Sequence, residues 1–119
     1  MAYLALTHRA LRDIEGIKNY SIEQWGERVA DDYLNAIEGA LGRLRENPQL
    51  LRTSAGVSDS LCFYRVRQHF VVCSLIEDRV VVLTVKHGAM DLPSRIAELE
   101  PQLKTEAEMM HRRFKNKRP

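Results

Sequence analysis

The residues best suited to chemistry lie at the ends of two apolar runs in the second half of the chain. The stretch HFVVCSLIEDRVVVLTVKHGAMD covers residues 69–91, and its second apolar run ends at Lys86, His87 and Gly88. A histidine titrates near neutral pH and can act as an acid or a base, while a cation can stabilise the charge of a transition state. His69 stands at the start of the first run. This placement is compatible with catalysis, with partner binding, or with simple termination of a strand.

Other familiar catalytic and metal-binding patterns are missing from the sequence. Histidines at positions 8, 69, 87 and 111 are scattered, and the cysteines lack the spacing of a zinc site. Neither a P-loop glycine pattern nor a GxSxG elbow occurs. We therefore expect no metal and no cofactor. Cys62 and Cys73 lie in apolar strand-like runs, where a reduced cysteine behaves as a small hydrophobic residue, so we expect a cytoplasmic protein without a structural disulfide.

Length and charge favour one ordinary globular core. The 119 residues are 45% apolar and 29% charged, and the net charge of +2 gives no global basic field for nucleic-acid binding. No apolar run reaches the roughly 18 residues that a membrane span needs, and the N-terminus becomes charged too early for a secretory signal. The last nine residues, HRRFKNKRP, carry five Lys or Arg and no acid. Such a run is usually a solvated tail and less often contacts phosphate or an acidic partner.

The elements that must position the candidate residues begin with a short strand and two helices. Residues 3–6 read as a strand, and two segments with apolar residues every three or four positions follow it. The first helix should end at Gly26 and the second at Pro48. Because the link between them is short, they should pair as a hairpin. We expect Trp25 and Tyr33 to pack in the core or at the helix junction, with exposure to a partner as the alternative.

Three strands should follow, near 61–67, 69–76 and 79–86. Their links are too short for a parallel crossover, so consecutive strands must be antiparallel. The last strand is apolar on both faces, which is typical of an interior strand. In the first of the three, alternation places Arg65 and Arg67 together on one face. We therefore expect one face of the sheet to pack on helices and the other to be partly wet.

A helical extension should complete the chain. Apolar residues recur at helical spacing after residue 93, and Pro101 should kink or split this helix. We expect packing to about residue 110 and a loose tail beyond it. The sequence thus predicts an α+β fold in which an antiparallel sheet packs on an N-terminal two-helix hairpin, in the order β-α-α-β-β-β. Residues 1–92 would form the main domain and 93–119 a C-terminal helical extension with a basic tail.

Several stretches of this pattern carry a family resemblance. They are Ala10 with Asp13-Ile14, Trp25-Gly26-Glu27, Ala30 and Tyr33, Asn47-Pro48, Tyr64-Arg65, His69, and the terminal Lys86-His87-Gly88-Ala89-Met90-Asp91. In order and spacing, these residues resemble the ParE branch of the RelE/ParE toxin superfamily, which includes plasmid stabilisation proteins. The resemblance covers about residues 2–92, and the residues after 92 lie largely beyond the usual family core.

The resemblance implies the toxin of a type II toxin–antitoxin pair. Its expected partner is a cognate antitoxin whose flexible C-terminal segment wraps the toxin and neutralises it, giving a toxin–antitoxin hetero-oligomer. The ParE branch is associated with inhibition of DNA gyrase, whereas the RelE branch cuts mRNA in the ribosome. The fold implied is an antiparallel sheet against a two-helix hairpin, which matches the order of elements read from periodicity.

The sequence departs from the RelE-like nucleases. These carry an arginine in the strand that corresponds to 69–76, but no cation follows His69 there, and no tyrosine follows Tyr64. A nuclease built from His69, Lys86 and His87 remains open. Our leading interpretation is a non-enzymatic toxin that binds gyrase, with no catalytic residue assigned. The alternatives are a ribosome-dependent mRNA endonuclease and a purely regulatory member that only binds its antitoxin.

The residues predicted to bind a partner are Arg65, Arg67, His69, Lys86, His87 and Met90. Lys86, His87 and Met90 would form a rim at the end of the last strand. Arg65 and Arg67 would meet an acidic antitoxin segment or the toxin's target. The simpler interpretation makes His87 a polar residue that closes the sheet, Lys86 a solvated strand end, and the two arginines part of a solvated face.

Overall fold

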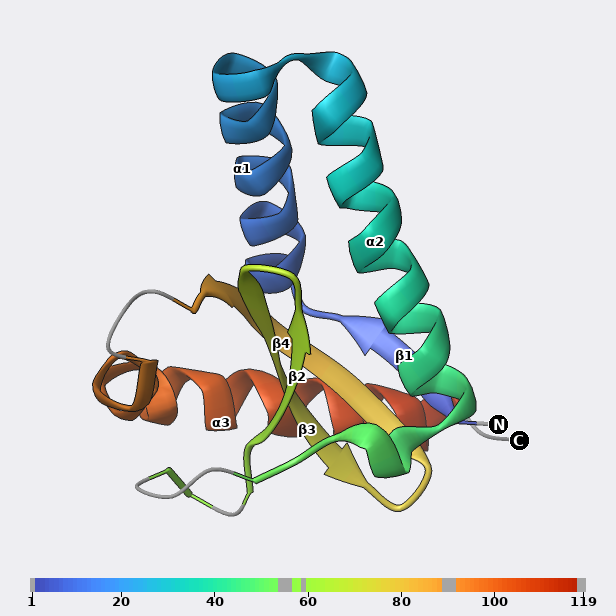
Figure 1. Cartoon of the computed structure of the whole chain (residues 1–119). Helices are drawn as coiled ribbons and strands as arrows, with labels where there is room; N and C mark the ends of the chain where they lie inside the picture. Colours follow the sequence, from blue (N-terminus) through green and yellow to red (C-terminus); the bar gives the residue numbers. More distant parts are fainter. Residues whose placement is uncertain (1, 54–56, 59, 89–91, 118–119) are drawn as a thin grey trace.

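The structure is a computed structural model that describes residues 2–53, 57–58, 60–88 and 92–117. Its elements are β1 (Tyr3–Leu6), α1 (His8–Trp25), α2 (Glu27–Glu46), the 3-10 turn η1 (Pro48–Leu50), β2 (Cys62–Val66), β3 (His69–Ile76), β4 (Arg79–His87) and α3 (Leu92–Lys117) (Figure 1). This order confirms the predicted β-α-α-β-β-β pattern with a helix after it. Within the described residues, no helix combines the length and the apolar character that crossing a membrane would require.

The four strands form one sheet in the order β1-β4-β3-β2. The neighbours β2, β3 and β4 are antiparallel, as predicted from their short links. β1, however, runs parallel to β4, with Leu4 opposite Val80, so the sheet is mixed rather than wholly antiparallel. A parallel pair needs a long connection. The helical hairpin, β2 and β3 all lie between β1 and β4 in the chain and supply it.

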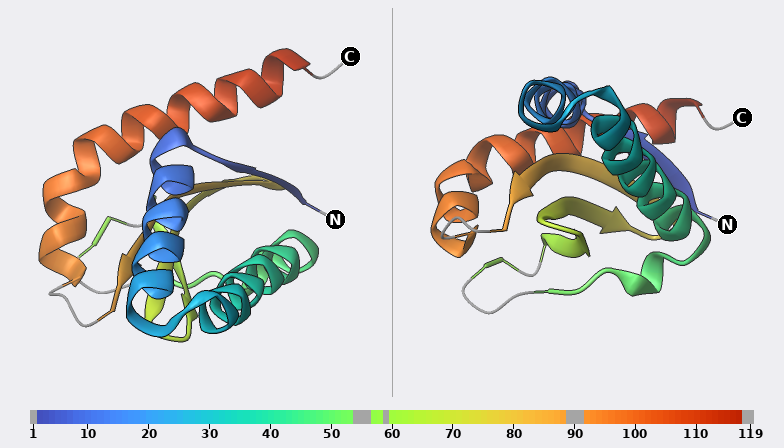
Figure 2. Two further views of the ribbon diagram at one scale, coloured as in Figure 1. Left: turned by 90° about the horizontal axis from the view of Figure 1, so that it is seen from above. Right: turned by 45° about the horizontal axis from the view of Figure 1, so that its top comes forward.

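The hairpin of α1 and α2 covers one face of the sheet (Figure 2). Ile37 and Leu44 of α2 are almost fully buried against Val71 and Val80 of the sheet. Ala10 of α1 is also buried, and such small side chains let the helix backbone approach the strands closely. Burying large aliphatic side chains contributes about 1.5–3 kcal/mol each. This layer therefore holds the hairpin firmly at its base.

The opposite face of the sheet, which we expected to be partly wet, is covered by α3. Ile96 and Leu103 of α3 are fully buried and pack in one cluster with Val81, Leu83 and Phe63. The two apolar faces of β4 thus each have a helical cover, as an interior strand requires. The face is nevertheless partly wet, as expected, since Arg65 of β2 remains exposed on it. The cover that α3 gives to β4 could not be read from alternation in β2 alone.

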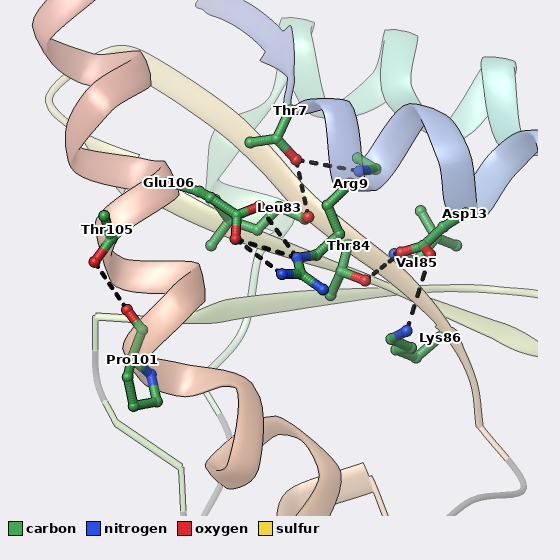
Figure 3. Close-up of polar contacts among 11 residues, drawn as sticks. Thr7, Arg9, Asp13, Leu83, Thr84, Val85, Lys86, Pro101, Thr105 and Glu106 are labelled. Carbon is green, nitrogen blue, oxygen red and sulfur yellow. Dashed lines mark hydrogen bonds and ion pairs between the residues drawn. The ribbon is translucent and has the colours of Figure 1, made fainter.

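Side-chain hydrogen bonds fix α1 to β4 (Figure 3). The Thr7 hydroxyl accepts the Ala10 N–H at 3.1 Å, which caps α1, and donates to the Leu83 carbonyl at 3.0 Å. Six residues later, Asp13 Oδ2 accepts the Val85 N–H at 3.1 Å and the Thr84 hydroxyl. Capping and charged acceptors of this kind each contribute about 1–2 kcal/mol. The C-terminal half of β4 is therefore held in register with the first two turns of α1.

Pro101 lies within α3 without splitting it. The helix is continuous from Leu92 to Lys117 and curves over the sheet (Figure 2). Pro101 itself is exposed, and its carbonyl accepts the Thr105 hydroxyl at 3.1 Å. A proline on the solvent side costs a backbone hydrogen bond but leaves the packed face intact, and curvature relieves the clash of its ring. Of the kink or split that was predicted, the split does not occur, and the helix bends as a whole instead.

Contacts continue beyond residue 110, where we expected a loose tail. His111 is buried and lies 3.0 Å from the Ser74 hydroxyl, and the Phe114 ring lies 5.9 Å from that of Tyr3. Arg9 also reaches across to α3 and meets both carboxylate oxygens of Glu106 at 3.1–3.2 Å (Figure 3). α3 therefore contacts the sheet, β1 and α1. The division of the chain at residue 92 stays a prediction.

Candidate functional site

A cavity of about 410 Å³ lies between the hairpin and the ends of β3 and β4. We call it the hairpin pocket. It is lined by Asp13, Gly16, Ile17, Tyr20, Ser21, Trp25, Tyr33, Gln68, His69 and His87. α1 supplies one wall, Tyr33 of α2 another, and the β2–β3 turn and the end of β4 the floor. Two of the residues predicted from the sequence, His69 and His87, are thus brought together here.

The floor of the hairpin pocket is a hydrogen-bonded cluster. The Tyr33 hydroxyl lies 2.5 Å from Nδ1 of His69 and accepts the backbone N–H of Gln68 at 3.1 Å. Because the Gln68 N–H already donates to the phenol oxygen, we assign the phenol proton to His69 Nδ1, which leaves the imidazole proton on Nε2. The rings of His69 and His87 are 5.1 Å apart. The cluster therefore joins α2, β3 and β4 at one point.

His69 is neutral at neutral pH. Burial, and to a smaller extent the nearby His87, lower its pKa to about 4. Desolvation disfavours the charged imidazolium, as for any half-buried histidine. A neutral His69 can accept or donate a hydrogen bond, but it supplies no positive charge to a ligand. His69 consequently makes the pocket floor polar without adding a positive charge to it.

The cations beside the hairpin pocket each face a carboxylate. Lys86 Nζ lies 3.9 Å from Asp13 Oδ1, and Arg67 Nη1 lies 2.9 Å from Asp32 Oδ2. The Arg67 guanidinium also lies 5.6 Å from the centre of the Tyr33 ring. None of the described residues that line the pocket is lysine or arginine. Its aromatic walls suit an aromatic or aliphatic side chain of a partner better than a phosphate group.

Arg65 and Arg67 do not share a face of the sheet, contrary to the alternation rule. Arg67 adopts a positive φ of 51° in the β2–β3 turn, so the strand alternation ends before it. Its side chain turns toward α2, whereas Arg65 stacks on Phe70 at 5.5 Å on the α3 side. The predicted partner-binding set is thus divided between two surfaces. Met90 lies outside the described residues.

An exposed aromatic pair lies at the hairpin tip; sequence reasoning kept exposure of Trp25 as an alternative but missed its pairing with Tyr20. Trp25 is 60% exposed and Tyr20 57%, and their rings pack edge to face at 5.7 Å. Trp25 lies at the helix junction, as one expectation had it, but it is exposed rather than packed in the core, because the tip of the hairpin stands clear of the sheet (Figure 1). Helical spacing shows which residues share a face, but not how far along the helix that face is covered. Tyr33, by contrast, is half-buried.

The cysteines lie opposite each other across β2 and β3, and both are free thiols. Burial raises the pKa of the Cys62 thiol, and burial together with the nearby Cys62 raises that of Cys73. Neither is therefore an activated nucleophile. Within the described part of the chain, no three His, Cys, Asp or Glu side chains gather in a way that could hold a metal ion.

Comparisons with known proteins agree with this architecture. A family model described as ParE toxin of type II toxin-antitoxin system, parDE, matches residues 4–92. A "Toxin ParE" of Escherichia coli is 28% identical over 98 residues, which cover 82% of this chain and 94% of that protein. A solved structure, the chromosomal ParDE TA system from P. aeruginosa, has a TM-score of 0.65 at 14% identity and covers 73% of this chain and 96% of that one. At that identity the likeness concerns the fold alone.

Proposed function

The chain belongs to the ParE family of type II toxin–antitoxin toxins, since the family model covers residues 4–92, and from this premise we propose that it inhibits DNA gyrase by binding it. A cognate antitoxin would neutralise the toxin in a hetero-oligomer. Both steps would take place in the cytoplasm. The family assignment confirms the resemblance read from the sequence, while gyrase and the antitoxin are the proposed partners.

The hairpin pocket is the observation that supports binding. Trp25 and Tyr20 protrude at its mouth, and aromatic residues of this kind carry much of the binding energy at protein interfaces. Behind them, Tyr33 and the neutral His69 offer hydrogen bonds in a cavity that Ile17 and the aromatic side chains also line. A protruding aromatic side chain and an adjoining pocket together form a surface that can bind another protein.

A gyrase assay with matched variants tests this function. The purified chain should inhibit supercoiling by gyrase or increase the DNA cleaved by it. Trp25→Ala should weaken the effect about tenfold, because losing one aromatic anchor typically costs about 1–2 kcal/mol or more of binding free energy. Leu11→Ala, which removes an exposed apolar side chain outside the pocket, is the control and should leave inhibition unchanged. A wild-type chain without effect on gyrase would refute the proposal.

A ribosome-dependent mRNA endonuclease is the second candidate, and the paired imidazoles of His69 and His87 favour it. The rings are 5.1 Å apart, and His87 at the end of β4 is exposed. A nuclease would use one such group to move a proton. Codon-linked cuts in primer extension, abolished by His87→Ala, would support this activity. Intact transcripts during growth arrest would exclude it and leave gyrase as the target.

A further inference from the structure

A buried polar cluster lies beneath the last turns of α3, on the sheet face opposite the hairpin. His111 of α3 is only 6% exposed, and its Nε2 lies 3.0 Å from the Ser74 hydroxyl of β3. Arg79, the first residue of β4, is 9% exposed. Burial, and to a smaller extent the nearby Arg79, lower the pKa of the His111 imidazole. Three elements that are far apart in the chain thus meet at one histidine.

Two atoms of this cluster are complementary as long as the imidazole is neutral. Nε of Arg79 and Nδ1 of His111 are both buried, and neither has a hydrogen-bond partner among the described residues. Buried polar groups are nearly always paired, because an unpaired group loses its hydration without compensation. We assign the imidazole proton to Nε2, donated to Ser74, which makes Nδ1 an acceptor facing the Arg79 Nε–H donor. A direct or water-bridged contact can therefore satisfy both atoms in the neutral state alone.

The charged groups around His111 also disfavour a proton on it. Arg79 forms one ion pair with a described residue, Glu77, at the long distance of 3.9 Å, and the Glu77 side chain is 70% exposed. On α3 itself, Lys104 and Glu108 line a cavity of about 320 Å³ together with His111, and their charges oppose each other. The other described residues of that cavity are uncharged: Ser60, Leu61, Ser74, Ile76 and Ala107. A protonated His111 would therefore be a second buried cation beside Arg79.

His111 lies in the part of α3 that is least firmly held. The middle of the helix is anchored by Leu103, which is fully buried against the sheet. Past His111, the Phe114 ring contacts Tyr3 at 5.9 Å, but the Tyr3 side of this contact is 48% exposed. The ion pair between α1 and α3 is also partly exposed. Segments with few buried contacts open most easily, so residues 107–114 can detach while Leu103 keeps the rest of α3 in place.

We propose that His111 is a proton-operated latch, which holds residues 107–114 of α3 on the sheet at neutral pH and releases them in mild acid. Protonation turns Nδ1 into a donor that faces the Arg79 guanidinium. The imidazolium would leave this place for the adjoining cavity, where water and Glu108 can stabilise its charge. Release would uncover Leu61, which lines the same cavity and is 1% exposed at neutral pH. The latch does not rest on the proposed function.

Amide hydrogen exchange of the full chain at pH 7.5 and pH 5.5 tests the latch. Protection factors, which divide out the pH dependence of exchange in an unfolded peptide, report how often each amide opens. The docked imidazole binds a proton less readily than the released one, so docking weakens as the pH falls below the ordinary pKa of about 6.5. Protection across 107–114 should fall by up to about tenfold, the limit for one proton. At both pH values it should stay below that of the slowest amides of β4, because the opening is local.

Three variants separate the latch from other effects of acid. His111→Gln can still donate to Ser74 and accept from Arg79 but does not titrate, so protection across 107–114 should be equal at the two pH values. Arg79→Gln removes the buried charge, and it should move the NMR titration midpoint of His111 part of the way to its ordinary value and reduce the fall in protection. His69→Asn also removes a half-buried histidine, but from the hairpin side. It is the matched control and should leave the fall across 107–114 unchanged.

The outcomes decide between a local latch and general acid unfolding. A fall in protection that is lost in His111→Gln and kept in His69→Asn supports the latch. A fall that persists in His111→Gln overturns it, and so does a titration midpoint of His111 at the ordinary value. If His69→Asn abolishes the fall, residues 107–114 open only when the whole chain unfolds, and the latch is rejected. None of these measurements involves gyrase, so the supercoiling assay and the latch stand or fall separately.

Discussion

The Tyr33 hydroxyl lies 2.5 Å from Nδ1 of His69 and so joins α2 to the first residue of β3. The same hydroxyl accepts the Gln68 N–H, so one side chain of the hairpin holds both the β2–β3 turn and the imidazole. Arg67, in the same turn, lies over the Tyr33 ring. The helices thus do more than cover the sheet. They fix the orientation of the polar groups that floor the hairpin pocket.

Removal of the Tyr33 hydroxyl should therefore destabilise the fold. Tyr33→Phe leaves His69 Nδ1 and the Gln68 N–H without their partner, and we expect a loss of about 1–2 kcal/mol in the free energy of unfolding. Urea denaturation followed by circular dichroism measures it. Tyr20→Phe, at an exposed tyrosine of the same pocket, is the control and should change stability by less than about 0.5 kcal/mol. Equal losses in both variants would contradict the assigned hydrogen bonds.

The low pKa of His69 should make stability fall in mild acid. In the unfolded chain the imidazole binds a proton at its ordinary pKa of about 6.5, whereas in the folded chain it does so only at about 4. Between these values the unfolded state binds more protons, so stability decreases as the pH is lowered from about 6.5 toward 4 and is unaffected by His69 above that range. His111, whose pKa is also lowered by burial and by Arg79, acts in the same direction.

Unfolding at pH 7 and pH 5 measures this effect, with His69→Asn as the comparison. The free energy of unfolding of this variant should fall less between pH 7 and pH 5 than that of the wild type. Part of the fall should remain, because His111 still contributes to it. An NMR titration of the imidazole protons provides the direct check. A midpoint for His69 near its ordinary value would show that burial does not hold the ring neutral.

Much of the fold could be predicted from local patterns. The unbroken apolar run of β4 correctly indicated an interior strand, and Gly26 and Pro48 correctly marked the ends of the two hairpin helices. The cover of the second face could not be predicted in this way. Phe63 and Leu103 belong to one buried cluster although they are far apart in the chain, and no local pattern specifies such a cluster.

The candidate site was harder to predict than the fold. His69 and His87 were singled out by their place at strand ends, and the β3–β4 register does bring them together. Tyr33 was taken as a packing residue because spacing cannot show that its hydroxyl reaches β3. Arg67 was predicted on the wrong face because an alternating sequence pattern does not show where the strand ends in a turn with positive φ. Side-chain partners depend on tertiary geometry, and in the folded chain the predicted partner-binding residues lie on two different surfaces.

Gly88 is required for close packing at the end of β4. A Cβ at this position would lie 2.9 Å from Cε2 of the Phe70 ring. We expect Gly88→Ala to cost about 1–2 kcal/mol, as for other overpacked sites, because the ring must shift. Gly42→Ala, on α2 where a Cβ meets nothing within 4 Å, should instead stabilise the protein by about 0.5–1 kcal/mol. Thermal denaturation of the pair should give shifts of opposite sign, and a matching sign would contradict the packing at Gly88.

Leu103 tests how far the core depends on α3. Its side chain is fully buried between α3 and the sheet, so Leu103→Ala should lower the free energy of unfolding by about 2–5 kcal/mol in a single cooperative transition. Met109→Ala, on an exposed side of the same helix, should cost less than about 0.5 kcal/mol. A small loss at Leu103, or a separate early transition for α3, would instead support a main domain of residues 1–92 that folds by itself.

Asp13→Asn should lower the free energy of unfolding far more than Asp32→Asn, although both carboxylates lie on the hairpin and face a cation. Asp13→Asn keeps one acceptor oxygen but loses the charge that holds the Val85 N–H, the Thr84 hydroxyl and, more distantly, Lys86. Hydrogen bonds to charged groups are worth about 1.5–3 kcal/mol, so we expect a loss in that range. Asp32→Asn breaks only an exposed pair with Arg67 and should cost less than about 0.5 kcal/mol. Chemical denaturation compares the two.

Because Asp13 also lines the hairpin pocket and holds the end of β4 against α1, its loss should loosen the position of His87 and weaken inhibition of gyrase. Asp32→Asn should preserve both the position of His87 and the inhibition. Equal effects of the two substitutions would mean that the end of β4 is positioned by the apolar core alone.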